Sequence, residues 1–267
     1  DEFDEMYEMY ERKTSISKTK IRAQELIGAL LKERAETGRI YIMNIDHCNT
    51  HSSFKDKVYM SNLCQEITLP TTPLDHIDDT KGEIALCILS AINLGLIRDK
   101  DELEGLCDLS VRALDEIIDY QEYPIEAARI SAESRRSLGI GYIGLAHFLA
   151  KNHVKYDDKE ALTLVDEITE AFQYYLLKAS NNLAVEKGKC EYFEMTKYSD
   201  GILPIDTYKK DLDKIVKRKL SYDWKQLRKD IQEHGLRHST LSAQMPSESS
   251  SVVSNATNGI EPPRDYL

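Results

Sequence analysis

The chain has 267 residues, of which 41% are hydrophobic and 30% charged, a length and composition typical of one large or two ordinary globular domains. A formal net charge of −11 without a dense stripe of Lys and Arg argues against nucleic-acid binding, and no stretch nears the roughly 18 apolar residues of a membrane span. Five widely spaced cysteines without a visible secretory signal favour free thiols and a cytoplasmic location.

Helical and extended patterns alternate in the first part of the chain. Apolar residues at a spacing of three and four predict a helix over residues 14–36, which Gly38 ends. Residues 39–45 are predicted to form a buried strand, and the polar residues 46–61 a loop. Residues 65–70 read as a short extended segment that ends at a proline.

Helices dominate the middle of the chain. The small apolar residues of 84–97 fit either a strand or a buried helix, and residues 103–120 are predicted to form an amphipathic helix. Pro124 is expected in the first turn of the next helix, where proline is tolerated. Residues 159–187 form the clearest predicted helix, with Gly188 as its C-cap.

The last part of the chain combines a charged region with a predicted strand. Residues 200–236 are mixed and charged, with Trp224 as the expected packing anchor, and residues 239–245 are predicted to be a strand. Strands separated by helical hairpins indicate an α/β fold in which helix exceeds strand. The pattern alone does not choose between an open sheet and a barrel.

Gly139, Gly141 and Gly144 match the spacing Gly-x-Gly-x-x-Gly of dinucleotide-binding loops. Such loops follow a strand and open a helix, whereas the flanks here read as helical with no preceding strand. Close helix packing is therefore the favoured explanation of the three glycines.

Asn62, Cys64 and Glu66 alternate along a run that reads as extended. In an extended chain, residues i, i+2 and i+4 point to the same side, so an amide, a thiol and a carboxylate would converge on one ligand. Such a set can hydrogen-bond an alcohol, remove its proton and supply a sulfur reactant. On the pattern alone, a buried cysteine flanked by surface polar groups is the more common explanation.

The run from Pro246 to Ser251 follows the predicted strand and is rich in serine. Successive backbone N–H groups and hydroxyls in such a turn can bind phosphate or diphosphate. An ordinary helix N-cap turn explains the same residues equally well.

The remaining histidines and thiols give weaker signals. His47, Cys48 and His51 could supply three zinc ligands, but no second pair follows at zinc-finger spacing. A role in shaping the loop that leads to Cys64 is the better explanation of these three residues. Cys87 lies in an apolar run and reads as a core cysteine.

Several strings, in order and nearly end to end, resemble the large (alpha, catalytic) subunit of class I ribonucleoside-diphosphate reductases. Long colinear strings of this kind are far more specific than any single motif. They are residues 33–41 (ERAETGRIY), 46–51 (DHCNTH), 61–67 (SNLCQEI), 82–87 (GEIALC), 136–141 (RSLGIG), 201–208 (GILPIDTY), 246–251 (PSESSS) and 254–264 (SNATNGIEPPR).

The resemblance implies part of a ten-stranded α/β barrel, helix-rich, with a finger loop that carries a radical cysteine. The implied activity is the radical-based reduction of ribonucleoside diphosphates to 2′-deoxyribonucleoside diphosphates for DNA synthesis. Cys64 would be the thiyl radical that abstracts the 3′ hydrogen of the substrate. Glu66 would be the base for the 3′ hydroxyl, and Asn62 would hydrogen-bond the ribose. Cys87 would be one half of the redox pair that supplies the reducing electrons.

The resemblance also predicts how the substrate and partners are bound. Ser247, Glu248, Ser249 and Ser250 would hold the diphosphate. We expect no metal and no cofactor in this chain itself, because the radical would come from a metal-containing small subunit and the ATP and dNTP effectors would bind elsewhere. Thioredoxin or glutaredoxin and the rest of the large chain are the other expected partners.

Residues 1–267 are expected to form one partial barrel domain, without the nucleotide-sensing domain and the C-terminal tail of the family. The start at Asp1 without a methionine, and Asp265 where the family pattern leads us to expect glycine, suggest a fragment that is inactive alone. The alternative is a non-catalytic piece of a split enzyme that acts as an association module.

Overall fold

The structure, a computed structural model, describes residues 2–263. The chain divides into two compact units, Asp1–Ile42 and Met43–Leu267. The expectation of a single partial domain stays a prediction, and the expected departure at Asp265 lies outside the described residues. Among residues 2–263, no helix combines the length and the apolar character needed to cross a bilayer.

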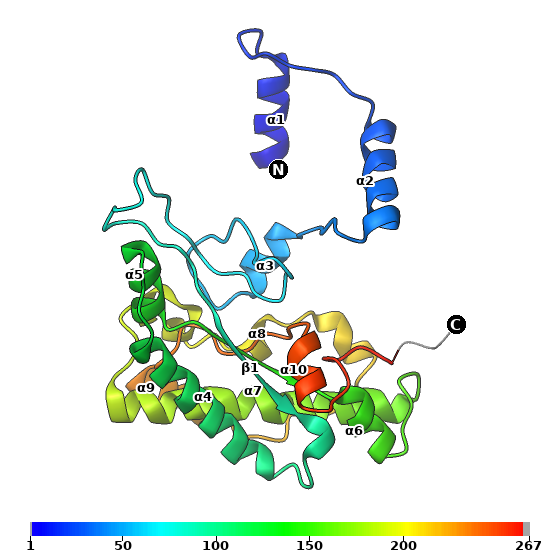
Figure 1. Cartoon of the computed structure of the whole chain (residues 1–267), viewed down its shortest axis with the longest axis vertical. Coiled ribbons are helices and arrows are strands. Elements are labelled where there is room, and N and C mark those ends of the chain that lie inside the picture. Colours follow the sequence, from blue (N-terminus) through cyan, green and yellow to red (C-terminus); the bar gives the residue numbers. More distant parts are fainter. Residues whose placement is uncertain (1, 264–267) are drawn as a thin grey trace. The chain divides into compact units, whose positions relative to one another are not determined.

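The first unit consists of two helices, α1 (Glu2–Arg12) and α2 (Ala23–Thr37) (Figure 1). The helix predicted over 14–36 is confirmed only in its second part, because residues 14–22 are not helical. Gly38 ends α2 as predicted, with a positive φ of 66° and its N–H donated to the Arg34 carbonyl. Neither helix contains a buried residue, so the apolar side chains of this unit have no core of their own.

The second unit is built around two parallel strands, β1 (Ile88–Asn93) and β2 (Leu138–Ile143). Ile88 pairs with Leu138, and the register continues to Asn93 with Ile143. As parallel strands require, the connection between them is long and helical. It contains α4 (Glu102–Tyr120) and α5 (Glu126–Arg135).

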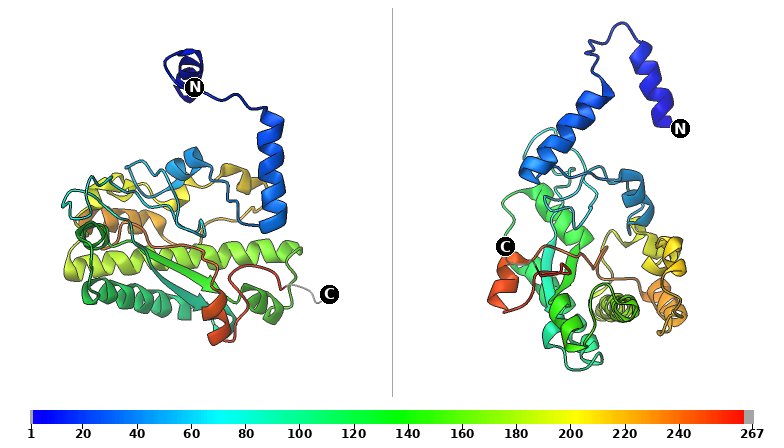
Figure 2. Two further views of the ribbon diagram at one scale, coloured as in Figure 1. Left: turned by 45° about the horizontal axis from the view of Figure 1, so that its top comes forward. Right: turned by 90° about the vertical axis from the view of Figure 1, so that its right-hand side faces the viewer.

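The long helix α7 (Lys159–Lys187) runs beside α4 and the strands (Figure 2). Its inner face joins that of α4 in the main core, where Leu103, Val111, Leu176 and Leu177 are all fully buried. Burying aliphatic side chains stabilises a fold by about 1.5–3 kcal/mol each, so this helix pair is the main stabilising contact of the unit.

Short helices complete the second unit. Trp224, at the start of α9, is buried as predicted, and its Nε1 donates to Glu170 Oε1 of α7 at 3.0 Å. The remaining elements are α3 (Ile45–His51), η1 (Leu94–Leu96), α6 (Leu145–Lys151), η2 (Phe193–Met195), η3 (Lys197–Asp200), α8 (Pro204–Thr207), η4 (Lys210–Lys214), α9 (Trp224–His234) and α10 (Glu248–Val253), where η marks a 3₁₀ helix.

The predicted helices 103–120 and 159–187 are confirmed, whereas two predicted strands are not. Residues 39–45 form no strand, and α3 begins at Ile45, the last residue of the predicted strand, and continues into the predicted loop. Residues 239–245 run beside β2 but form only one bridge, between Ser242 and Ile140. An extended segment becomes a strand only when a neighbour pairs with it, and no sequence pattern identifies that neighbour.

The α/β class is confirmed, since helices surround a parallel sheet. Within residues 2–263 the sheet has two strands, so the ten-stranded barrel stays an expectation. The next helix, α5, begins at Glu126, two positions after Pro124, which therefore precedes the helix and does not lie in its first turn.

The three spaced glycines belong to a strand and its end, which corrects the prediction of helical flanks without a strand. Gly139 and Gly141 lie on β2, and Gly144 caps α6 with a φ of 75°. A Cβ atom at Gly139 would stand 2.7 Å from Cys87 Sγ, and one at Gly141 would collide with the Ala243 carbonyl oxygen. The glycines therefore allow close packing, as expected, but of a strand and not of a helix.

Asp115 of α4 is completely buried, and cations surround it. Its Oδ1 accepts from Arg136 Nε at 2.6 Å and from Arg237 Nε at 3.2 Å, while its Oδ2 accepts from Lys187 Nζ at 3.3 Å. Burial alone would raise its pKa, but hydrogen bonds from His238 and Arg136 hold the pKa of Asp115 far below its usual range. The carboxylate therefore stays charged inside the core.

His238 lies between Ser180 and Asp115, and all three residues are completely buried. Its Nδ1 is 2.9 Å from Ser180 Oγ and its Nε2 is 3.2 Å from Asp115 Oδ1. Because a carboxylate only accepts, the Nε2 atom carries the proton and Nδ1 accepts from Ser180. Burial lowers the pKa of His238 to about 4, so the ring is neutral at pH 7. Without access to a substrate, this Ser-His-Asp set ties the core together.

Gly141→Ala should lower the free energy of unfolding by about 1–3 kcal/mol, because the new methyl group meets the Ala243 carbonyl and, at 2.9 Å, the Met245 sulfur. Gly105→Ala is the matched control. It lies in α4 with no atom within 4 Å of its Cβ position, and it should raise stability by about 1 kcal/mol. Urea denaturation followed by circular dichroism measures both, and equal effects would contradict the packing role of Gly141.

His238 should make stability fall as the pH drops from 7 to 4.5. In the unfolded chain the pKa of His238 returns to about 6.5, so the unfolded state takes up a proton as the pH falls below this value. In the folded state the ring stays neutral until about pH 4. The stability advantage of the parent over His238→Gln should therefore narrow by about 2–3 kcal/mol across this range. Urea titrations at each pH test this, and parallel pH curves for the two proteins would refute it.

Candidate active site

The residues Asn62 to Ile67 form a tight turn, so the prediction that Asn62, Cys64 and Glu66 alternate along an extended run is wrong. The Asn62 N–H donates to the Ile67 carbonyl, and the Ile67 N–H donates back to Asn62 Oδ1, both at 3.3 Å. Gln65 adopts a left-handed conformation with a φ of 60°, which folds the chain back on itself. The side chains of Asn62, Cys64 and Glu66 therefore do not follow the alternation of an extended strand.

Of the three candidate residues on the turn, two are exposed and one is half-buried. Asn62 and Cys64 are exposed, whereas Glu66 points inward. The Glu66 Oε2 atom is buried and has no hydrogen-bond partner among the described residues. A carboxylate oxygen without a donor is free to accept a proton or a hydrogen bond from a ligand.

Cys87 immediately precedes β1 and is half-buried. It packs against a small apolar cluster that includes Phe54, Ile67 and Ala243, which agrees in part with the prediction of a core cysteine. Burial, and then the negative charge of Glu66, raises the pKa of the Cys87 thiol to about 12. Because of this raised pKa, the side chain is a protonated thiol at pH 7.

Two pockets lie beside the turn. One, of about 400 Å³, is lined by Asn62 and Cys87 together with Ile67, Thr72 and Glu83. Ile67 therefore lies at the junction of both pockets, since it also lines the second.

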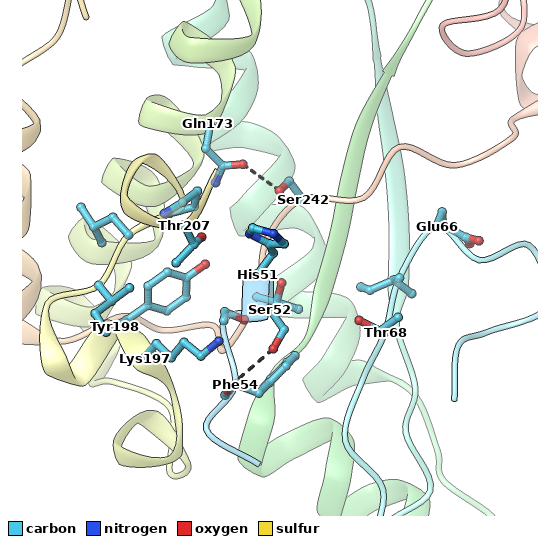
Figure 3. Close-up of a pocket in the computed structure, with 16 residues that line it drawn as sticks. His51, Ser52, Phe54, Glu66, Thr68, Gln173, Lys197, Tyr198, Thr207 and Ser242 are labelled. Carbon is cyan, nitrogen blue, oxygen red and sulfur yellow. Dashed lines mark hydrogen bonds between the residues drawn. The ribbon is translucent and has the colours of Figure 1, made fainter. Parts of the chain in front are cut away.

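The second pocket, of about 230 Å³, is lined by Glu66 and Thr68 on one side (Figure 3). Gln173 and Ser242 face each other beside it, and the Ser242 hydroxyl donates to Gln173 Oε1 at 2.7 Å. Tyr198 is a further lining residue, and burial raises the pKa of its phenol to about 12. The pocket offers hydroxyl and amide groups at pH 7, in addition to the Glu66 carboxylate.

The expected diphosphate residues lie at the start of α10 and line neither of these two pockets. Ser247 is buried as the N-cap residue, and its N–H and hydroxyl donate to Asn258 Oδ1 at 2.9 and 3.3 Å. Glu248, Ser249 and Ser250 are exposed. The segment is thus the start of a helix, where the first backbone N–H groups have no partner within the helix. This agrees with an ordinary N-cap turn and also with an anion-binding site.

The possible zinc ligands His47, Cys48 and His51 all lie on α3, and the rings of His47 and His51 are 6.4 Å apart. Among residues 2–263, no group of three or more His, Cys, Asp or Glu side chains is arranged to hold a metal ion. The zinc alternative therefore gains no support.

Asn49 of α3 supports the residues that precede the turn, and no pattern in the sequence indicated it. Its side-chain amide donates to the Val58 carbonyl at 2.9 Å and accepts from the Val58 N–H at 2.8 Å, as a neighbouring strand would. Asn49 thus takes part in shaping the loop before Cys64, and the same role for His47, Cys48 and His51 stays a prediction. The role of Asn49 is not visible in the sequence, because its partner Val58 is brought to it only by the folded chain.

Comparison with known proteins connects this arrangement to an enzyme family. The family described as "Ribonucleotide reductase, barrel domain" matches residues 1–267. The ribonucleoside-diphosphate reductase subunit alpha of Haemophilus influenzae is 60% identical over the whole chain, and the ribonucleoside-diphosphate reductase 1 subunit alpha of Escherichia coli is 58% identical over the same length. The alpha subunit of phage T4 is 46% identical over 99% of the chain.

The chain spans about 36% of the length of the first two relatives and 35% of the third. The family match covers residues 1–267, and the comparison with the Haemophilus influenzae subunit covers the whole chain, so the matched region includes the turn at Cys64, the segment at Cys87 and the start of α10. The chain therefore belongs to the ribonucleotide reductase barrel-domain family.

Proposed function

We propose that this chain supplies the catalytic core of a ribonucleoside-diphosphate reductase, which converts ribonucleoside diphosphates to 2′-deoxyribonucleoside diphosphates. The observation that carries the proposal is the end-to-end match to the barrel-domain family, with alpha subunits of such reductases as relatives. The finer fold that goes with it is part of a ten-stranded barrel, with the Asn62–Ile67 turn at the tip of its finger loop.

The proposed chemistry begins at Cys64. Its thiyl radical takes the hydrogen atom from C3′ of the ribose, which leaves a thiol and a carbon-centred radical. Glu66 accepts the proton of the 3′ hydroxyl, and the 2′ hydroxyl leaves as water after it takes a proton from the thiol pair formed by Cys87 and a second cysteine. This pair becomes a disulfide, and its two electrons and remaining proton put a hydrogen on C2′ in place of the lost hydroxyl. Cys64 finally returns the hydrogen atom to C3′, and Glu66 returns its proton to the 3′ oxygen.

The environment of Glu66 supports its role as the base. A buried carboxylate oxygen without a donor has a vacant acceptor site that a substrate hydroxyl can fill. Cys87 supports the redox role, because its raised pKa keeps the thiol protonated until it is needed as a hydrogen or proton donor. Asn62 lines the same pocket as Cys87, which supports its proposed hydrogen bond to the ribose.

The residues Ser247 to Ser250 are proposed to hold the diphosphate. Three of them are exposed, and the backbone N–H groups of the first turn of α10 are free of intrahelical bonds. A grip of N–H groups and hydroxyls binds an anion even though the chain carries a net charge of −11.

The proposal includes partners. A small subunit with a metal centre would generate the radical, thioredoxin or glutaredoxin would reduce the disulfide, and ATP or dNTP effectors would bind outside this chain. The rest of the large chain would complete the barrel, in the reducing cytoplasm that the free cysteines suit.

One observation favours a second candidate function, an association module of a split enzyme. The helices α1 and α2 leave apolar side chains such as Phe3 and Leu31 exposed. Unburied apolar surface of this kind is typical of a segment that packs against another polypeptide.

Cys64→Ser in the full-length large chain should abolish turnover, by at least a thousandfold, because an alcohol does not form the required radical. Substrate binding should stay within about threefold of the parent, since the exposed thiol fills no core position. Product formation and equilibrium binding of the diphosphate test the two effects. The control is Cys48→Ser, another thiol from the same part of the chain, which should keep full activity. Turnover near the parent rate in Cys64→Ser would refute the radical role.

The 267 residues alone should convert no CDP to dCDP with dithiothreitol, because the proposal assigns the second redox thiol to the rest of the large chain and the radical source to the small subunit. Activity should appear only when the complementary polypeptide and the small subunit are added. Formation of dCDP by the isolated chain would contradict this expectation. Failure to associate with the complement would argue against the split-enzyme alternative.

A further inference from the structure

Arg135, the last residue of α5, has a side chain that is only 3% exposed and yet fully paired. Its Nε donates to Glu83 Oε2 at 2.6 Å and its Nη2 to Glu83 Oε1 at 3.0 Å, a two-pronged contact. Its Nη1 donates to Asp56 Oδ2 at 3.0 Å. The guanidinium carbon also lies 5.1 Å from the ring centre of Tyr192 and 5.9 Å from that of Phe54. One side chain thus joins two separate carboxylates.

The two carboxylates stand at opposite ends of the segment that carries the proposed catalytic turn. Asp56 precedes residues 57–71, and Thr72 follows them. Thr72 exchanges two backbone hydrogen bonds with Glu83, at 3.0 and 3.2 Å, and its hydroxyl donates to Glu83 Oε1 at 3.1 Å. Through Glu83 and Asp56, Arg135 therefore holds both ends of the segment.

Glu83 also leads directly to Cys87, four positions further along the chain. The Ile84 N–H donates to the Ala127 carbonyl of α5 at 3.1 Å, which fixes this stretch to the same helix as Arg135. The base of the turn and the approach to Cys87 are thus both attached to α5.

We propose that Arg135 is a positioning residue for the reductase reaction: it clamps residues 57–71 at both ends and sets Cys64 and Glu66 against Cys87. The inference rests on the proposed function and adds to it a residue that touches no reacting atom. The planar fork of arginine is required, because a lysine ammonium makes no two-pronged contact with Glu83 while also reaching Asp56.

Loss of the contacts of Arg135 should lower the reaction rate, because the proposed reaction tolerates little displacement of the reacting groups. Hydrogen-atom and proton transfers demand placement within a fraction of an ångström, and a displacement of about 1 Å can cost a hundredfold in rate. Loosening one end of the segment should therefore lower kcat. The proposed diphosphate grip at Ser247 to Ser250 makes no contact with Arg135, so KM should change little.

The test uses Arg135→Lys and Asp56→Ala in the full-length large chain assembled with its small subunit. Asp56→Ala removes one arm of the clamp and leaves the buried pair of Arg135 and Glu83 intact, so it should fold even if Arg135→Lys does not. In both variants we expect amide hydrogen exchange in residues 57–71 to accelerate at least tenfold. We also expect kcat to fall at least tenfold, with KM within threefold of the parent.

Arg136→Lys is the matched control. Arg136 is the next residue, its side chain is 5% exposed, and it is ion-paired to Asp115 and Asp119, but it makes no contact with the segment 57–71. It should lower the melting temperature while exchange in 57–71 and kcat stay within twofold of the parent. A purely structural role of Arg135 predicts that both arginine variants behave alike.

The proposal is overturned if Asp56→Ala leaves exchange in 57–71 within twofold of the parent, if exchange accelerates without a loss of kcat, or if Arg136→Lys reproduces both effects. Hydrogen exchange requires no turnover, so it judges the clamp separately from the enzyme activity. An assembled parent that reduces no ribonucleoside diphosphate would refute the proposed function, whatever the exchange shows, and with it the positioning role.

Discussion

Two consecutive arginines at the end of α5 connect the loops of the candidate site with the helix α4. Arg136 adopts a left-handed conformation, with a φ of 49°, and its N–H closes α5 on the Ala132 carbonyl. The turn sends Arg135 toward Glu83 and Asp56 and Arg136 toward Asp115, in both cases into buried surroundings. Leaving a buried charge without its partner costs about 3–5 kcal/mol, so neither contact can be given up. The loops of the candidate site and the helix α4 are thereby attached to the same two residues.

This junction explains how irregular segments come to carry a defined site. The turn at Asn62 and the residues before β1 have no regular ladder of their own, so side-chain contacts take its place, from Asn49 at Val58 and from Glu83 at Thr72. β2 starts directly after the arginines, and its Gly139 leaves room for Cys87. Loops positioned by a rigid scaffold are where proteins commonly place reactive groups.

The sequence predicted what depends on local periodicity and missed what depends on distant partners. The helices α4 and α7 were found because each has a long apolar stripe, whereas β2 was missed because it is buried on both faces and shows no alternation. The turn at Cys64 was read as extended because a left-handed Gln65 has no signature in a residue of that type. The identities of the candidate site residues came from resemblance, and Arg135 escaped notice because its partners lie 52 and 79 positions away.

The buried carboxylates divide into two kinds, and the division bears on function. Asp115, Glu83 and Glu170 are each held by cations or backbone donors, as carboxylates that stabilise a fold must be. Glu66 differs, because among the described residues its buried Oε2 has neither a hydrogen bond nor an ion pair. An unsatisfied acceptor of this kind costs about 1–3 kcal/mol in the free protein. A folded chain tolerates that cost where a ligand supplies the missing donor, and a ribose hydroxyl is a donor of the right kind.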